Sequence, residues 1–222
     1  MASEVDICNL ALGHLGDNAT VASLEPPEGS AQAEHCARFY PIARDGLLEL
    51  HDWNFATKRA RLAQTTSPYP QWAYAYVQPS DCLSVLAVLD PAAASDYSQS
   101  MPAPYSQSHL VNTGLGQYTP QEFVCETDDS GRELVLTNQR DALVRYVAYV
   151  TDTTRFSPLF TTTLTWHLAS MLAGPIIKGE TGRAEAKRCQ QMAAFYLGRA
   201  TTSDSKQRRV QPTQSVPWVN GR

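Results

Sequence analysis

The apolar residues near the start of the chain recur at helical spacing in two stretches. Ser3 and Asp6 have the form of a helix N-terminal cap, and the apolar positions after them keep helical spacing until Gly16. A second apolar stripe runs through residues 30–48. Pro41 lies inside this stripe, where it removes a backbone hydrogen-bond donor. The pattern therefore predicts two helices, the second kinked or divided at Pro41.

Two more helices are predicted towards the C-terminus. Ser157 followed by proline is a strong start signal, because serine caps the first turn and proline fits within it. Apolar residues share one face from there to Gly174 and Pro175, which are expected to end the helix. A last stripe over roughly residues 181–199 predicts a fourth helix. The sequence after it has no periodicity and many turn formers, so it predicts a tail.

Between the helical ends, the period of the apolar pattern changes to that of strands. The segments are short, rich in Val, Leu and Tyr, and several alternate. They are YAYVQP (74–79), LSVLAVLD (83–90), QEFVCET (121–127), RELVLT (132–137) and LVRYVAYV (143–150). TDDSGRE at 127–133 has the turn chemistry of a β-hairpin, whereas the polar, proline-containing segment 91–108 predicts a long loop.

The fold class predicted by this order is α+β. One-sided apolar helices at both ends of the chain must bury those faces, and packing them together as a helical bundle does so. The strands then form a separate β-rich insert, sandwich or barrel-like, and an extended C-terminal tail follows. The predicted divisions are 1–55 and 153–200 for the bundle, 56–152 for the β-rich domain and 201–222 for the arm.

Composition excludes several classes of protein. No stretch is long and apolar enough to span a membrane, and the first residues include Glu4 and Asp6 where a signal peptide would be basic. The 5 cysteines are scattered without C-x-x-C spacing, which argues against a disulfide framework or a structural zinc site. We expect a protein that is made in a reducing cytoplasm and that has no membrane partner.

The net charge of −4 is unevenly distributed. Residues 1–54 hold nine acids and two bases, giving −7, whereas residues 199–222 hold one acid and five bases, giving +4. An acidic start and a basic tail suggest contacts with different partners, and a solvated face is the alternative. No recognised DNA-reading motif appears, so sequence-specific nucleic-acid binding is not expected.

The sequence carries no signature of catalysis. Motifs for phosphate cradling, dinucleotide binding, zinc hydrolysis and serine hydrolysis are all absent. NTGLGQY at 112–118 has two close glycines but is typical of a turn. His35 and Cys36 are adjacent on a predicted helix and so point in different directions.

Two acid pairs are the remaining candidates, because a glycosidase needs only two carboxylates on either side of a sugar bond. Asp128 and Asp129 lie in the predicted hairpin turn, and Glu25 and Glu28 flank a proline pair. Neither pair has surroundings that would raise the pKa of a carboxyl group. We therefore predict no catalytic residue, no metal ligand and no cofactor.

Three segments carry a resemblance to a known family, the tail tubular protein A or head-to-tail adaptor of short-tailed bacteriophages. Residues 7–63 resemble its N-terminal signature, including an L-x-x-L-G helix end, a V-x-S-L link and a Trp-Asn-Phe-Ala close. YVQPSDCL at 76–83 is similar to its tyrosine-proline-aspartate element. Residues 143–176 resemble the strand, D-x-x-x-F-x-P element and helix that follow.

The resemblance implies assembly and not catalysis. Members of this family form a dodecameric ring between the portal protein and the tail nozzle protein, which resembles tail tubular protein B, and leave an axial channel for genomic DNA. It implies a virion protein located in the tail at the portal vertex. Passing DNA should slide along the channel without sequence-specific binding, and an acidic subunit is compatible with that.

The stretch LELHDWNFATKRARLA at 48–63 then receives an interpretation. Trp53 and Phe55 would anchor the end of the second helix in the bundle core. The cations after them would pair with acids of a neighbouring subunit, since a ring needs two different complementary faces. The expected intersubunit residues are Lys58, Arg59, Arg61, Glu34, Asp45 and Glu49.

The C-terminal tail is interpreted as a portal-binding arm, because C-terminal extensions in this family look like portal-embracing arms. Its apolar residues could dock in grooves of the portal once ordered, with its basic residues adding attraction. The expected portal-binding residues are Lys206, Arg208, Arg209, Val210, Val216, Trp218 and Val219.

Two other functions stay open at this point. A related accessory family is associated with peptidoglycan hydrolysis, although no catalytic carboxylate site matches. A stopper or gatekeeper ring below the adaptor is the other, and only an adaptor should bind the portal directly.

Overall fold

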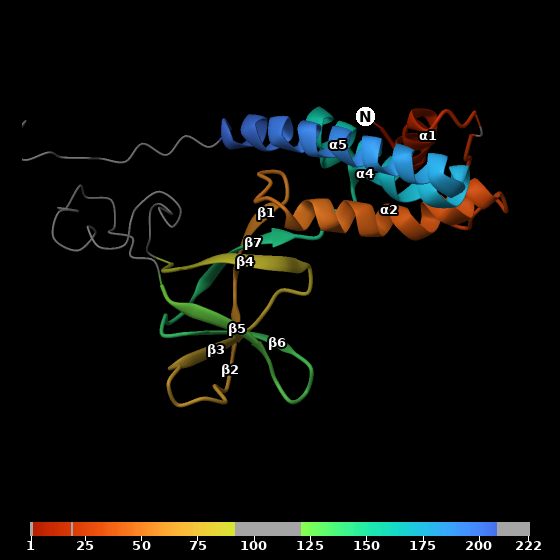
Figure 1. Ribbon diagram of the computed structural model, residues 1–222. Coiled ribbons are helices and arrows are strands. Elements are labelled where there is room, and N and C mark those ends of the chain that lie inside the picture. The colour runs from red at the N-terminus through yellow and green to blue at the C-terminus, as the bar shows by residue number, and fades with distance from the viewer. Residues whose placement is uncertain (1, 19, 92–120, 208–222) are drawn as a thin grey trace, which may run out of the picture. The chain divides into compact units, whose positions relative to one another are not determined.

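A computed structural model describes residues 2–18, 20–91 and 121–207 of the chain. The chain divides into two compact units, and Figure 1 colours it from one end to the other. The helical unit comprises Met1–Ala56 and Tyr149–Gln207, and the β unit comprises Thr57–Ala148. Helices at both ends of the chain and antiparallel sheets between them confirm the α+β class.

The helical unit contains α1 (Glu4–His14), α2 (Ala31–Glu49), α4 (Pro158–Ile177) and α5 (Gly179–Ser205), with the short 3-10 helix η2 (Thr153–Arg155) before α4. The predicted starts are confirmed, since the side chains of Ser3, Ser30 and Ser157 each accept a hydrogen bond from the backbone N–H of the first turn. Helix α4 packs against α1, α2 and α5. It is therefore the central helix of the unit.

Two helices continue through a proline that was expected to end or to kink or divide them. Pro41 does not divide α2, which runs as one helix from Ala31 to Glu49. Pro175 does not end α4, which continues to Ile177 and ends at Lys178, where φ is 61°. Both helices bury apolar side chains close to their proline, so tertiary packing outweighs the lost backbone bond.

Helix α5 is longer than predicted, and this moves the start of the tail. It spans Gly179–Ser205 instead of roughly 181–199, so residues 201–205 belong to a helix and not to an extended arm. The helical unit likewise takes in residues 149–152, which the sequence pattern assigns to the β-rich domain.

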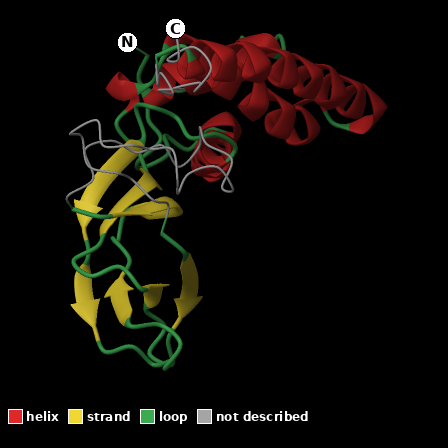
Figure 2. Cartoon of the chain, turned by 90° about the vertical axis from the view of Figure 1, so that its left-hand side faces the viewer, coloured by secondary structure: helices red, strands yellow, loops and turns green. Residues whose placement is uncertain are grey.

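The β unit contains two antiparallel sheets, visible as separate groups of strands in Figure 2. One has the order β1-β7-β4, and the other has the order β2-β3-β6-β5. The strands are β1 (Thr57–Arg61), β2 (Ala63–Thr65), β3 (Tyr74–Val77), β4 (Cys82–Leu89), β5 (Phe123–Thr127), β6 (Glu133–Thr137) and β7 (Leu143–Ala148).

The predicted strands are confirmed in β3 to β7, whereas the apolar pattern does not predict β1 and β2. Both lie in TKRARLAQT, where charged and small residues replace the expected apolar alternation. The three cations therefore lie on a strand and not in a connecting loop. The β5–β6 hairpin is confirmed, with Gly131 at φ 78° supplying its left-handed position.

The core of the β unit draws residues from both sheets. Tyr76 on β3 and Val135 on β6 pack in one cluster with Val88 on β4, and the Tyr76 hydroxyl donates to the carbonyl of Gln139 at 2.8 Å. The loop predicted at 91–108 and the turn at 112–118 lie almost entirely outside the described residues. Among the helices that are described, none is long and apolar enough to cross a membrane.

Candidate functional site

The segment after α2 turns sharply and buries Trp53 in the helical unit. Trp53 is 0 % exposed, and its indole Nε1 donates to the carbonyl of Leu47 at 2.8 Å. Its ring meets Phe160 of α4 edge to face, with 5.0 Å between the ring centroids. The Trp53 side chain thus joins the last turn of α2 to α4, because its ring packs against Phe160 and its indole N–H has a hydrogen-bond acceptor.

Phe55 extends this contact into an aromatic cluster. Its ring centroid lies 5.0 Å from that of Phe160 and 5.7 Å from that of Phe156. The guanidinium of Arg155, on η2, donates to the backbone carbonyl of Phe55. The chain passes between the helical and β units once after Phe55 and once before Arg155, and these two crossing segments are therefore held together.

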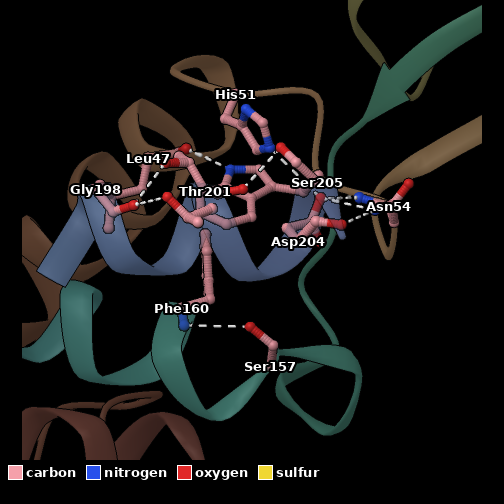
Figure 3. A network of polar contacts seen from close by, with 11 residues as sticks. Leu47, His51, Asn54, Ser157, Phe160, Gly198, Thr201, Asp204 and Ser205 are labelled. Atoms are coloured by element: carbon pink, nitrogen blue, oxygen red, sulfur yellow. Dashed lines mark hydrogen bonds and ion pairs between the residues drawn. The ribbon is translucent and has the colours of Figure 1, made fainter. Parts of the chain in front are cut away.

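Asn54, between these aromatics, binds the far end of α5 (Figure 3). Its side-chain Nδ2 donates to Asp204 twice, to Oδ2 at 2.9 Å and to the backbone carbonyl at 2.7 Å. Its backbone N–H also donates to Asp204 Oδ2, at 3.0 Å. His51 Nε2 lies 3.4 Å from the same oxygen. Asp204 is 4 % exposed, so this carboxylate is a buried acceptor at the last turn of α5.

The last turn of α5 is also held by local bonds. Thr201 Oγ1 donates to the carbonyl of Gly198 at 3.1 Å, and Ser205 Oγ donates to that of Thr201 at 2.8 Å, as Figure 3 shows. These bonds pair the side-chain hydroxyls, and the bonds between Asp204 and Asn54 explain why a run of poor helix formers stays helical. The apolar pattern assigns Asn54 and Asp204 no role, and the only signal in the sequence is the position of Asn54 inside the Trp-Asn-Phe-Ala close.

The cations that follow separate onto the two faces of β1. Lys58 donates to Asp81 Oδ2 at 2.6 Å, and the hydroxyl of Tyr146, its cross-strand neighbour, donates to Asp81 Oδ1 at 2.9 Å. The hydrogen bond from Lys58 holds the pKa of Asp81 below its usual range. Burial, then the bond to Asp81, raises the pKa of Tyr146 to about 12. Lys58 thus already has a partner within the chain.

Arg59 and Arg61 lie on the opposite face of β1, because neighbouring residues of a strand alternate. Both are exposed, and neither has an ion-pair partner within the described part of the chain. The residue across from Arg59 is Arg145 of β7, which is buried and has a contact of its own. Of the three predicted cations, these two are the ones without an ion pair among the residues that the structure describes.

The three predicted acids share one face of α2. Glu34, Asp45 and Glu49 are spaced so that they fall on the side opposite the buried residues of the helix. Asp45 already binds Arg44 Nε at 2.8 Å, and Arg44 reaches towards Glu4 at 3.9 Å. Glu34 and Glu49 have no ion-pair partner in the residues that the structure describes.

One acid of each pair weighed as catalytic groups makes structural contacts. Asp128 accepts from the backbone N–H groups of Ser130 and Arg132, both at 2.9 Å, and these bonds lower its pKa. Glu28 Oε2 accepts from the backbone N–H of Ala22 at 2.8 Å. Asp128 therefore stabilises the hairpin turn, and Glu28 stabilises the loop after α1.

Cys36, next to His35 in the sequence, is buried, and its thiol raises the pKa of the buried Cys8 thiol. The described ranges contain no group of three or more side chains that could hold a metal ion. Of the residues assigned to portal binding, Lys206 is exposed just after α5, and the others lie outside the described residues.

No protein-family model matches the chain, and no curated protein matches it either.

Proposed function

We propose that this chain is a structural subunit of the head-to-tail adaptor of a short-tailed bacteriophage. It forms a ring that joins the portal to the tail nozzle and surrounds the channel through which DNA leaves the head. The observation that carries the proposal is the Trp-Asn-Phe-Ala junction, which ties α2 to α4 and α5 immediately before the chain enters the β unit. No chemical step is assigned to the protein.

The arrangement of elements supports this proposal. A helical bundle from both chain ends and a β-rich domain from the middle are what the resemblance implies. The observed helical unit takes its helices from both ends, and the β unit has a core shared by two sheets. Architecture alone does not define function, and a ring also needs complementary surfaces on each subunit. The exposed acidic face of α2 is one such surface.

The test measures the native mass of the purified chain, alone and after mixing with purified portal rings. We expect a ring of about twelve copies on the portal, the number implied by the family resemblance. A chain that stays monomeric and leaves portal rings unchanged would overturn the proposal. Digestion of purified peptidoglycan by the chain would favour the accessory enzyme instead.

The structure also shows where the chain should be truncated to test the C-terminal arm. Truncation after Gly198 would remove Asp204 and damage the helical unit, so lost binding would say little about the arm. Truncation after Gln207 keeps α5 and its bonds intact. We expect this variant to fold and to bind portal rings at least tenfold more weakly, because it loses Arg208, Arg209 and Trp218. If this truncation left portal binding unchanged, the residues after Gln207 would not be the portal-binding arm.

A further inference from the structure

An exposed stripe on α2 combines an apolar centre with acids. It consists of residues that share the outer face of the helix, namely Glu34, Arg38, Ile42, Asp45 and Glu49, and we call it the α2 stripe. Ile42 is 57 % exposed, although it is one of the most apolar side chains in the unit. Acids outnumber the one base in the stripe, so its charge is negative.

A second exposed stripe, on α5, combines an apolar centre with bases. It consists of Lys187, Arg188, Gln191, Phe195 and Arg199, and we call it the α5 stripe. Phe195 is 56 % exposed, with the guanidinium of Arg199 at 5.4 Å from its ring centroid. No acid occurs between Glu185 and Asp204, and Arg188 is the only one of these bases that has an ion pair within the described chain, to Glu185.

We propose that the α2 stripe of one copy packs against the α5 stripe of the next, with Phe195 of one copy on Ile42 of its neighbour. This inference rests on the proposed function, because a ring needs a contact between two different faces of the same chain. Opposite charge around two exposed apolar residues is what favours a second copy as the occupant. This contact replaces the interpretation from the sequence, in which the acids of α2 pair with the cations of β1 in a neighbouring subunit.

The spacing along the two helices fixes their relative direction. Glu34 lies eight residues before Ile42, and Lys187 lies eight residues before Phe195, which is about 12 Å in each helix at about 1.5 Å per residue. If the helices run parallel, Glu34 therefore meets Lys187. Asp45, which also binds Arg44 of its own helix, and Arg199 lie three and four residues after the apolar centres and also meet. Both ends of the contact then join opposite charges.

The antiparallel arrangement of the two helices would bring like charges opposite each other. With Phe195 still on Ile42, Arg199 would face Arg38, four residues before Ile42. Lys187 would then face Glu49. Like charges opposed at an interface are unfavourable, so the parallel direction is the one assigned.

The two stripes lie on separate faces of the helical unit. The buried sides of α2 and of α5 both pack against α4, and each stripe lies on the side away from that contact. One copy therefore leaves both stripes uncovered, as the exposed Ile42 and Phe195 show. A contact of this kind repeats from copy to copy, which closes a ring if the rotation allows it.

Charge reversal with rescue tests the pairing. The full chain would be compared with the variants Lys187→Glu and Glu34→Lys and with the double variant that carries both. Self-association would be followed by sedimentation without portal rings and by native mass with them. Each single reversal should raise the concentration needed for half assembly by about tenfold, since attraction becomes repulsion. The double variant should recover at least most of this loss.

A matched control separates the two helix directions. Glu49→Lys lies on the same stripe, but in the parallel arrangement Glu49 has no cation opposite it. It should therefore fail to rescue Lys187→Glu. Rescue by Glu49→Lys and not by Glu34→Lys would overturn the assigned direction.

The interface and the adaptor proposal can fail separately. Rings that form on the portal equally well with Lys187→Glu and with Phe195→Ala would overturn this interface and leave the adaptor proposal standing. A wild-type chain that self-associates through these stripes but ignores portal rings would overturn the adaptor and support the interface. No self-association under either condition would overturn both.

Discussion

Replacing Asn54 by alanine should loosen the end of α5. The variant loses two side-chain hydrogen bonds to Asp204, one to its carboxylate at 2.9 Å and one to its backbone carbonyl at 2.7 Å. A bond to a charged group contributes about 1.5 to 3 kcal/mol, and a neutral one about 1 kcal/mol. The backbone N–H of Asn54 still donates to Asp204, so the carboxylate is not left without a partner. We expect the free energy of unfolding of the helical unit to fall by about 3 kcal/mol.

Hydrogen exchange and thermal unfolding measure this effect. The midpoint temperature of thermal unfolding of the helical unit should drop by about 10 °C. The amides of residues 201–205 should be the first to lose protection from hydrogen exchange. Asn18→Ala is the matched control, because Asn18 is exposed and its replacement should change stability by less than about 0.5 kcal/mol. If Asn54→Ala were as stable as that control, the contact between Asn54 and Asp204 would not be what holds the helix end, and this reasoning would be refuted.

Three other changes test the remaining contacts. Trp53→Ala should cost about 3 to 5 kcal/mol of unfolding free energy in a chemical denaturation series, because it empties a fully buried site, whereas Trp53→Phe should cost about 1 kcal/mol. Lys58→Ala should cost at most about 0.5 kcal/mol at neutral pH, since the Lys58–Asp81 pair is more than a third exposed. It should also flatten the loss of stability in acid, because the lowered pKa of Asp81 adds stability that disappears as pH falls through that pKa. Burial lowers the pKa of His14 and of His167, so the unfolded chain takes up protons first and the helical unit should unfold at lower temperature at pH 5.5 than at pH 7.5. A melting temperature unchanged between these pH values would contradict that reasoning.

Helix starts and most strands could be predicted because local chemistry determines them. Ser3, Ser30 and Ser157 cap helices through bonds to their own first turns, and four of the five predicted strands carry apolar residues that the sheets bury. The fifth, β5, contributes only the half-buried Phe123. Strand β1 could not be predicted in this way, since its sequence TKRAR has no apolar face. It is a strand because β7 pairs with it along its whole length.

The ends of α4 and α5 depend on contacts between residues far apart in the sequence. The apolar pattern places Asp204 in a polar tail, and only its burial against Asn54, 150 residues away, shows why α5 continues past residue 199. The periodicity likewise does not reveal Asp81 as a partner of Lys58. Asp81 binds Lys58 within the β unit, so Lys58 is not an unpaired cation. Contacts between such distant residues leave no trace in the periodicity of apolar residues along the sequence.

The burial along α5 shows which of its residues can act together in assembly. The side of α5 that packs against α4 is buried, which leaves Lys187, Phe195 and Arg199 on a single exposed face. Their spacing can be compared with that of Glu34, Ile42 and Asp45 on α2. The sequence already shows an acidic start of the chain, but the resemblance pairs those acids with the cations that follow α2. The structure holds Lys58 within its own copy and leaves α5 with bases and an exposed aromatic ring. An acidic helix face therefore has its best complement on α5, and the matched spacing is the reason to test that pairing before any other.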